Sequence, residues 1–450
     1  MVNILTEEKF RKLASLDKKK ASLMWQFYLS GEGKERQEAE ELLDIELYQQ
    51  AKKDFSENIF LDPPDPSQCF GEYELGTVEY PPGKNYCSFG LKEDEWIKHL
   101  LICGMTGAGK TTFAFNLLKQ FKKFEKPFLI FDWKKNYRDL LQLPEFKNLK
   151  VFTVAKPSSP FFFNPLIPPP GCSCGEWLMK LVDVIKHAYF VGEGVEYLLR
   201  DAIDWVYDKC GVLDGSNTNI PTFYQVKEYV AKKTAMGRMG LWKASTLRVL
   251  ESLCFKHGLG SVVNHRKEWD HKKLLNADVV LELDALSDVD KIFLTESLIL
   301  WLYEFRKLHG KRETFKHTLI LEEGHHVLSL SKEHAQGAET IMETCLRQIR
   351  EFGQSIIILD QEPSKLSNSI KANTFTKITF NLGNGKDLLE ISNCMGLNKE
   401  ESEYINLLDV GQAIVAIKRK GVFMPLHVSF PKVELQKGLI GDEDLVGMKT

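Results

Sequence analysis

Apolar residues recur along this chain in two patterns, and the alternation between them predicts a mixed α/β fold. Short apolar runs are typical of buried strands, whereas apolar residues at every third or fourth position are typical of amphipathic helices. The expected strands are 98–103, 127–132, 150–154, 278–283, 317–321, 355–360, 375–382, 412–417 and 423–429. The expected helices after residue 100 are 111–124, 177–189, 195–210, 222–233, 241–255, 289–308, 335–352, 386–394 and 399–407. This alternation indicates a mainly parallel sheet.

Changes in the pattern divide the chain into five expected parts. The first is charged, has apolar residues at helical spacing, and ends in the linker Asp62–Pro66, which predicts two or three helices. A later helical block interrupts the alternation of strands and helices, so we interpret it as an insertion into one core. The parts are an N-terminal helical element (1–66), the first part of the core (67–171), the helical insertion (172–275), the second part of the core (276–431) and a C-terminal extension (432–450), expected to lie on a partner or in solvent.

The composition of the chain limits the cellular compartment and the binding partners that we expect. No apolar run is long enough to span a membrane, the first residues lack a signal-peptide pattern, and nine scattered cysteines suit a reducing compartment, so we expect a cytoplasmic protein. Cys172 and Cys174 form the only close pair; they are free thiols unless histidines or a second pair complete a metal site.

The net charge of −3 means that contact with nucleic acid requires a local basic surface. Two basic clusters could provide such a surface. The first is residues 18–20, for which a solvated helix face is the alternative interpretation. For the second cluster, the alternative is a flexible surface loop. The second cluster comprises Lys232, Lys233, Arg238 and Lys243 around a glycine turn.

The stretch Leu100–Thr112, LLICGMTGAGKTT, contains a complete GxxxxGK[ST] phosphate-binding loop between an expected strand and an expected helix. Its glycines allow turns that a Cβ would block, so that backbone N–H groups converge on phosphate oxygens. Lys110 supplies a charge for the β- and γ-phosphates, and Thr111 supplies a hydroxyl for Mg²⁺. We therefore expect a RecA-like P-loop NTPase core that uses ATP and Mg²⁺. The expected nucleotide-binding residues are Gly104, Thr106, Gly107, Ala108, Gly109, Lys110, Thr111 and Thr112.

Polar residues at two other strand ends complete the expected active site. The strand 317–321 ends in Glu322 and Glu323. We assign Glu322, with Thr111, to the Mg²⁺ shell and Glu323 to activation of the attacking water as general base; an exposed acid pair without a role is the alternative. Gln361 ends the strand 355–360, where a polar side chain could sense the γ-phosphate.

Arg347 and Arg350 lie on the helix expected before that strand. They are three residues apart and therefore share one helix face. A guanidinium group can neutralise the charge that develops on a transferring γ-phosphate, so we expect this pair to provide an arginine finger. The sequence does not choose between the two, and a routine surface arginine is the alternative for each.

Several segments together resemble the HerA/FtsK superfamily, in particular its HerA-like branch of ring-forming DNA translocases. The resemblance covers about residues 91–430. The segments that carry it are HLLICGMTGAGKTT at 99–112, FNPL at 163–166, LILEEGHHVL at 319–328, RQIREFGQSIIILDQEPSKL at 347–366 and LLDVGQAIV at 407–415.

The resemblance implies a hexameric ATPase that threads double-stranded DNA and works with a nuclease or another effector, in DNA end processing or anti-phage defence. Two departures accompany it. HerA proteins commonly begin with a small β-barrel, whereas residues 1–60 here have a helical pattern. The strand 375–382 offers Lys377 and Asn381 but no arginine, so an additional arginine sensor is missing.

Three functions are compatible with these features. The first is a Mg-ATP-driven DNA translocase or helicase that forms a ring. The second is a nucleotide-gated scaffold that assembles and regulates an effector nuclease, with little translocation of its own. The third is a motor for conjugation or packaging. Dependence of ATP hydrolysis on DNA discriminates the first from the second.

Overall fold

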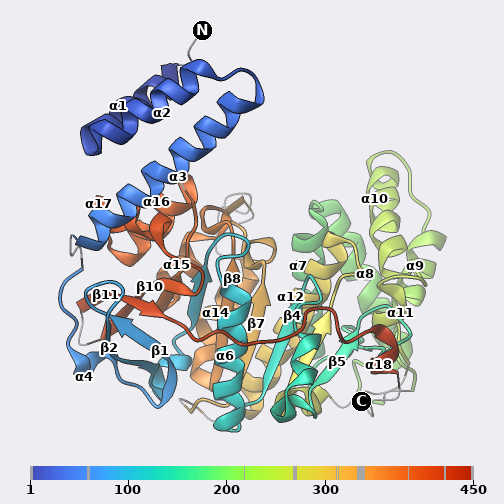
Figure 1. The fold of residues 1–450 in the computed structure, drawn as a ribbon. Helices are drawn as coiled ribbons and strands as arrows, with labels where there is room; N and C mark the ends of the chain where they lie inside the picture. The colour runs from blue at the N-terminus through green and yellow to red at the C-terminus, as the bar shows by residue number, and fades with distance from the viewer. Residues whose placement is uncertain are drawn as a thin grey trace.

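The computed structural model describes residues 4–57, 61–216, 218–266, 271–310, 312, 314–331, 340–383, 385–419 and 422–446. Within these residues, eleven strands form one sheet in the order β2-β1-β11-β10-β9-β3-β8-β7-β4-β6-β5 (Figure 1). The strands from β9 to β5 in this order are parallel, and the remaining strands extend the sheet with antiparallel pairs. The predicted α/β fold with a mainly parallel sheet is confirmed.

The strands are β1 Tyr73–Glu79, β2 Asn85–Leu91, β3 Leu100–Cys103, β4 Phe128–Asp132, β5 Lys150–Thr153, β6 Val279–Glu282, β7 His317–Glu322, β8 Gln354–Asp360, β9 Thr376–Thr379, β10 Gln412–Arg419 and β11 Val422–Ser429. The helices are α1 Ile4–Leu16, α2 Lys18–Ser30, α3 Lys34–Glu57, α4 Pro66–Cys69, α5 Glu93–Trp96, α6 Lys110–Lys123, α7 Cys174–Tyr189, α8 Glu193–Cys210, α9 Phe223–Lys232, α10 Arg238–Leu253, α11 Gly260–Val263, α12 Asp288–His309, α14 Ile341–Ile349, α15 Asn368–Asn373, α16 Lys386–Met395, α17 Lys399–Tyr404 and α18 Asp442–Leu445.

Two expected helices are shorter than their apolar pattern suggested. The helix expected at 335–352 is α14 followed by a 3₁₀ turn, Arg350–Phe352, because Gly353 takes a left-handed φ of 77° and ends it. Its first expected residues, 335–339, lie outside the described residues. The helix expected at 399–407 is α17 followed by the 3₁₀ turn Ile405–Leu407.

Helices cover both faces of the parallel strands because successive side chains on each buried strand point to opposite faces. In β3, Leu101 belongs to the buried cluster that includes residues of α7, α8, α12 and α14, whereas Leu100 and Ile102 belong to the cluster that includes residues of α6. The chain therefore leaves β3 on one face, through α6, and reaches β8 on the other, through α14. Such a change of face opens a crevice at the carboxyl ends of the strands.

The helical insertion shares its hydrophobic core with one face of the sheet. Trp177 and Leu181 of α7 belong to the same buried cluster as Phe293 of α12 and Leu129 of β4. The helices of the expected insertion are therefore packed onto the strands as a continuous layer.

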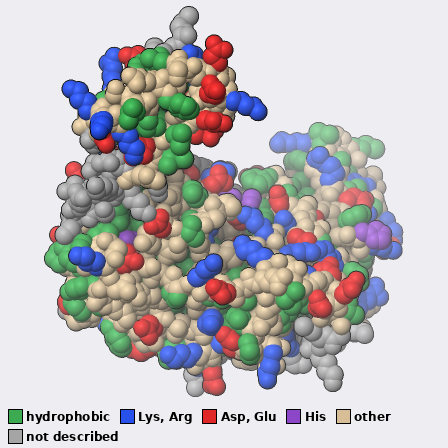
Figure 2. Space-filling model, in the orientation of Figure 1, with side chains coloured by type: hydrophobic (Ala, Val, Ile, Leu, Met, Phe, Trp, Pro, Cys, Tyr) green, Lys and Arg blue, Asp and Glu red, His purple; other side chains and the backbone are tan. Residues whose placement is uncertain are grey.

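The N-terminal element consists of α1, α2 and α3 and has a small core of its own, which includes Phe10, Leu13, Tyr28 and Leu43. It projects from the rest of the molecule, and hydrophobic side chains gather on its visible face (Figure 2). None of the helices in the described part of the chain is both long and apolar enough to cross a membrane.

Candidate active site

The phosphate-binding loop lies between β3 and α6, at the carboxyl edge of the sheet. A Cβ at Gly104 would approach the Cβ of Phe380 to 2.8 Å, and Gly109 takes a left-handed φ of 114° beside the backbone of Gly411. Both positions therefore require glycine. The Lys110 ammonium donates to the carbonyl oxygens of Gly104 and Met105, the latter at 3.0 Å, so it lies over the loop. Burial lowers the pKa of Lys110.

A pocket of about 780 Å³ opens in front of this loop. It brings together most of the residues predicted from sequence, with Gly104 and Ala108 forming the loop behind it. The predicted residues that line it are Thr106, Gly107, Gly109, Lys110, Thr111, Thr112, Glu322, Glu323 and Gln361.

A polar network crosses the mouth of the pocket from strand to strand. The Thr106 hydroxyl, after β3, donates to Gln361 Oε1 at 2.6 Å, after β8. The Gln361 amide donates to the Glu323 carboxylate, after β7. Glu323 also pairs with the Lys134 ammonium at 2.5 Å, after β4. Because β3, β8, β7 and β4 are consecutive in the sheet, one side chain from each strand end joins the network.

The two glutamates differ in environment. Glu322, the last residue of β7, is buried; burial and the nearby Asp132 raise its pKa to about 8. Burial also acts to raise the pKa of Glu323, but Lys134 and Gln361 outweigh it and hold the pKa below its ordinary value. Glu323 thus stays ionised near the phosphate loop, as a general base requires. A cation beside Glu322 would favour its ionised form, as a metal ligand requires.

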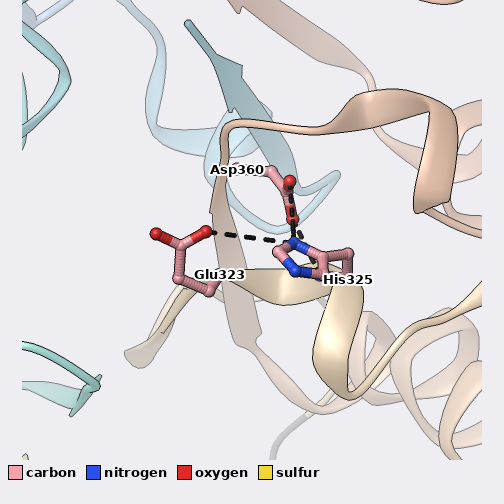
Figure 3. A group of neighbouring side chains, drawn as sticks. All are labelled: Glu323, His325 and Asp360. Atoms are coloured by element: carbon pink, nitrogen blue, oxygen red, sulfur yellow. Dashed lines mark hydrogen bonds and ion pairs between the residues drawn. The ribbon is translucent and has the colours of Figure 1, made fainter. Parts of the chain in front are cut away.

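His325 lies between the carboxylates of Glu323 and Asp360 (Figure 3). Its Nδ1 atom is 3.1 Å from both Asp360 oxygens and 3.9 Å from Glu323 Oε2, and its backbone N–H donates to Asp360 at 2.7 Å. Burial opposes protonation of His325, but the Asp360 carboxylate outweighs it and raises the pKa. The three groups are close enough to hold a cation, although hydrogen bonds already engage Asp360.

Sequence reasoning did not include Lys134, His325 and Asp360 among the site residues. Their positions in the sequence could have indicated a role in the site, because each residue lies at or just beyond the carboxyl end of a buried strand. Side-chain direction at those strand ends was not readable from the sequence.

Arg347 and Arg350 lie outside the pocket, at the C-terminal end of α14. The carbonyl oxygen of the neighbouring Leu346 is 2.7 Å from Nε2 of His99, directly before β3. Both arginines are therefore at the amino edge of the sheet, across the strands from the phosphate loop, and both are exposed. Within one chain they do not reach the nucleotide pocket, so a finger role would require a neighbouring subunit.

The basic cluster expected to face DNA is mostly occupied by internal contacts, so it is not a loop of four free cations. Lys243 donates to the carbonyl oxygens of Ala231 and Lys233, both at 2.7 Å, at the end of α9. Lys233 pairs with Asp201 at 2.6 Å. Lys232 pairs with Glu228 in the same helix, also at 2.6 Å. Arg238 stacks over Trp242 instead.

The C-terminal extension packs on its own chain, contrary to its expected placement on a partner or in solvent. Gln142 makes two hydrogen bonds with the backbone of Gln436, at 2.7 and 3.1 Å. Arg138 pairs with Asp442 at 2.8 Å. Residues 432–437 thereby line the nucleotide pocket. Leu445 is buried in the core cluster, and Val433, Leu435 and Ile440 pack against it, so the apolar residues of this segment were the available signal for its docking.

Comparison with known proteins agrees with this geometry. Residues 82–232, about a third of the chain, match a family model described as the central domain of the helicase HerA. This segment therefore resembles the HerA central domain, in agreement with the resemblance to the HerA/FtsK superfamily. Among curated proteins, no sequence matches the chain significantly.

Several solved structures share the fold at low sequence identity. VirB4 of Thermoanaerobacter pseudethanolicus is 16% identical, covers 80% of this chain and 96% of its own, and has a TM-score of 0.62. The bacterial conjugative coupling protein TrwB is 11% identical, covers 82% and 91%, and has a TM-score of 0.58. TrwB in complex with ADP and Mg²⁺ is 12% identical, covers 77% and 89%, and has a TM-score of 0.56. The core described here thus has a RecA-like P-loop NTPase fold.

Proposed function

We propose that this protein is a Mg²⁺-dependent ATPase that assembles into a ring, a hexamer in particular, and moves along double-stranded DNA. The observation that carries the proposal is the network across four adjacent strand ends, which holds Glu323 ionised beside the phosphate loop. ADP and Mg²⁺ occupy the related TrwB, which supports the same ligands here.

In this proposal each pocket residue has a defined role. The loop backbone and Lys110 bind the phosphates, Thr111 and Glu322 organise Mg²⁺, and Glu323 activates water. Gln361 senses the γ-phosphate through its contact with Glu323. Arg347 or Arg350 acts on the nucleotide of a neighbouring subunit.

The direct test measures ATP turnover with and without double-stranded DNA. We expect DNA to stimulate turnover, and added salt to weaken the stimulation, because protein contacts with DNA phosphates release counterions. Basal turnover that is intact and unresponsive to DNA at any salt concentration would contradict a DNA motor. Lys110→Ala should abolish both the basal and the stimulated rate.

A second candidate is a nucleotide-gated scaffold for an effector protein such as a nuclease. The supporting observation is the projecting N-terminal element, where Leu23, Phe27, Leu42 and Ile45 are each about half exposed or more. Exposed apolar side chains grouped on one element favour a protein partner. This candidate predicts turnover that responds to the partner and is indifferent to DNA. The similarity to TrwB makes a conjugation motor a variant of the first proposal.

A further inference from the structure

A groove of about 1280 Å³ runs along α10 in the helical insertion. One face of α10, with Arg238, Trp242 and Arg248, forms one wall, and the turn from α7 to α8, residues 189–195, contributes to the other. Tyr197 of α8 and Ser287 and Val289, at the start of α12, also line the groove. Because α12 follows β6, the groove lies at the sheet edge that also carries the nucleotide pocket. The volume exceeds that of most small-molecule sites, which favours an extended ligand.

Aromatic rings are presented along this groove. Phe190 is 68% exposed and Tyr197 is 51% exposed, although both line it. Trp242 is held in place by Gly194, since a Cβ at that glycine would approach the indole ring to 2.2 Å. Exposed apolar rings grouped in one groove favour a binding site, whereas rings scattered singly do not.

Two arginines give the groove a positive charge. Neither Arg238 nor Arg248 forms an ion pair within the described residues; Arg248 donates to the Ser245 hydroxyl at 3.1 Å, and Arg238 lies 5.2 Å from the centre of the Trp242 ring. Ten residues of helix place them about 15 Å apart along α10. One carboxylate, Glu193, also lines the groove, so the cations outnumber it.

A second carboxylate beside the groove is already satisfied. Asp290 accepts hydrogen bonds from Tyr189 at 2.8 Å, from Ser252 at 2.7 Å and from Ser287 at 2.8 Å. Its charge is dispersed over three hydroxyl groups, and it therefore opposes an anionic ligand less than an exposed carboxylate would.

We propose that this groove binds single-stranded nucleic acid. Unpaired bases can stack on Phe190 and Tyr197, while the phosphates between them meet Arg238 and Arg248. The bases of a duplex are covered by their neighbours and cannot use the rings in this way. The inference deepens the proposed function by adding a site for one strand, and it rests on that function for the identity of the partner as DNA.

The test measures binding of two fluorescein-labelled probes to the full chain without ATP, across a range of salt concentrations. One probe is a short oligothymidylate, and the other is an abasic oligonucleotide of the same length, which keeps the phosphates and lacks the bases. Without hydrolysis, the result does not depend on whether the protein is a motor. If the groove does not bind single strands, duplex DNA should still stimulate ATP turnover. If the protein is not a DNA motor, single strands should still bind to the groove.

Removal of the arginines and removal of the aromatic rings should change the binding of the two probes in different ways. Arg238→Ala/Arg248→Ala should weaken both probes and reduce the slope of log affinity against log salt by about 1.4, for two lost phosphate contacts. Phe190→Gly/Tyr197→Ala should weaken the oligothymidylate about tenfold or more, with an unchanged slope and unchanged abasic binding. Phe190 has a left-handed φ of 51°, which glycine adopts without strain, so this variant should keep its fold.

Lys209→Ala/Lys227→Ala is the matched control, because it removes the same charge from α8 and α9 of the same insertion, where Lys209 lies over the Trp205 ring and Lys227 pairs with Glu251. We expect it to bind both probes like the parent. Equal weakening by the control and the arginine variant would overturn the proposal, as would normal oligothymidylate binding by the aromatic variant. Displacement of the oligothymidylate by polyglutamate of equal charge at equal concentration would assign the groove to acidic peptides instead.

Discussion

Glu323 lies at the centre of the pocket network, and its geometry explains why two adjacent glutamates can have different roles. Its backbone is left-handed, with a φ of 48°, which turns its side chain out of the strand direction that Glu322 follows. Glu322 consequently faces Asp132 and Asn136 in the interior, while Glu323 meets Lys134 and Gln361 at the pocket mouth. This geometry suits the proposed roles, in which Glu322 binds a cation and Glu323 accepts a proton.

Glu323→Gln should retain ATP binding and lose turnover. The amide keeps the size of the side chain and removes the base, and positioned general bases contribute about 10²- to 10⁴-fold in rate. The measurements are nucleotide affinity and steady-state hydrolysis. Lys110→Ala is the contrasting variant, since it should weaken nucleotide binding itself. Hydrolysis by Glu323→Gln near the parent rate would show that another group activates water.

At the scale of elements, a buried histidine links the strand that precedes the phosphate loop to α14 and β8. His99 Nε2–H donates to the Leu346 carbonyl oxygen at 2.7 Å, and its Nδ1 accepts from the Ile356 N–H at 3.2 Å. These bonds use the neutral imidazole in one tautomer. Burial lowers the pKa of His99 from 6.5 to about 4.

From the lowered pKa of His99 we predict that the protein loses stability in mild acid. The unfolded chain binds a proton at His99 below pH 6.5, whereas the folded chain does not until about pH 4, so the free energy of unfolding falls as pH decreases between these values. One such group contributes about 1.5 kcal/mol of loss between about pH 6.5 and about pH 5.

The check is the pH dependence of denaturant unfolding in the parent and in His99→Asn. Asparagine tolerates the left-handed φ of 66° at this position and does not titrate. The variant should be less stable at neutral pH, because it loses a buried hydrogen bond, and should show a shallower decline in acid. If the free energy of unfolding declined equally with decreasing pH in the two proteins, the assignment of the effect to His99 would be wrong.

For the whole molecule, the positions of the phosphate loop and of the arginine pair at opposite edges of the sheet favour assembly as a condition for hydrolysis. Arg347 and Arg350 are exposed and do not line the pocket of their own chain. Only a second chain can bring such a pair to a nucleotide. Arginine fingers supplied by another chain contribute about 10³- to 10⁵-fold in rate.

A mixing experiment tests this arrangement. Lys110→Ala chains and Arg347→Ala/Arg350→Ala chains should each be almost inactive alone, the latter with normal ATP binding. Mixed assemblies should recover turnover wherever an intact arginine pair meets an intact phosphate loop. Assemblies shown to be mixed that recover nothing would count against a role across subunits, and a fully active monomer would exclude it.

The sequence by itself determined the fold class, the phosphate loop and most of the pocket, because these depend on local patterns. Periodicity marks buried strands, three glycines and a lysine mark the loop, and the end of a parallel strand marks the edge where polar residues gather. The tertiary structure decided what depends on neighbours distant in the chain. It placed Lys134 on Glu323, brought residues 432–437 to the pocket, and put Arg347 and Arg350 at the far edge. Side-chain direction and long-range backbone hydrogen bonds leave no periodic signal, so only the folded chain reveals them.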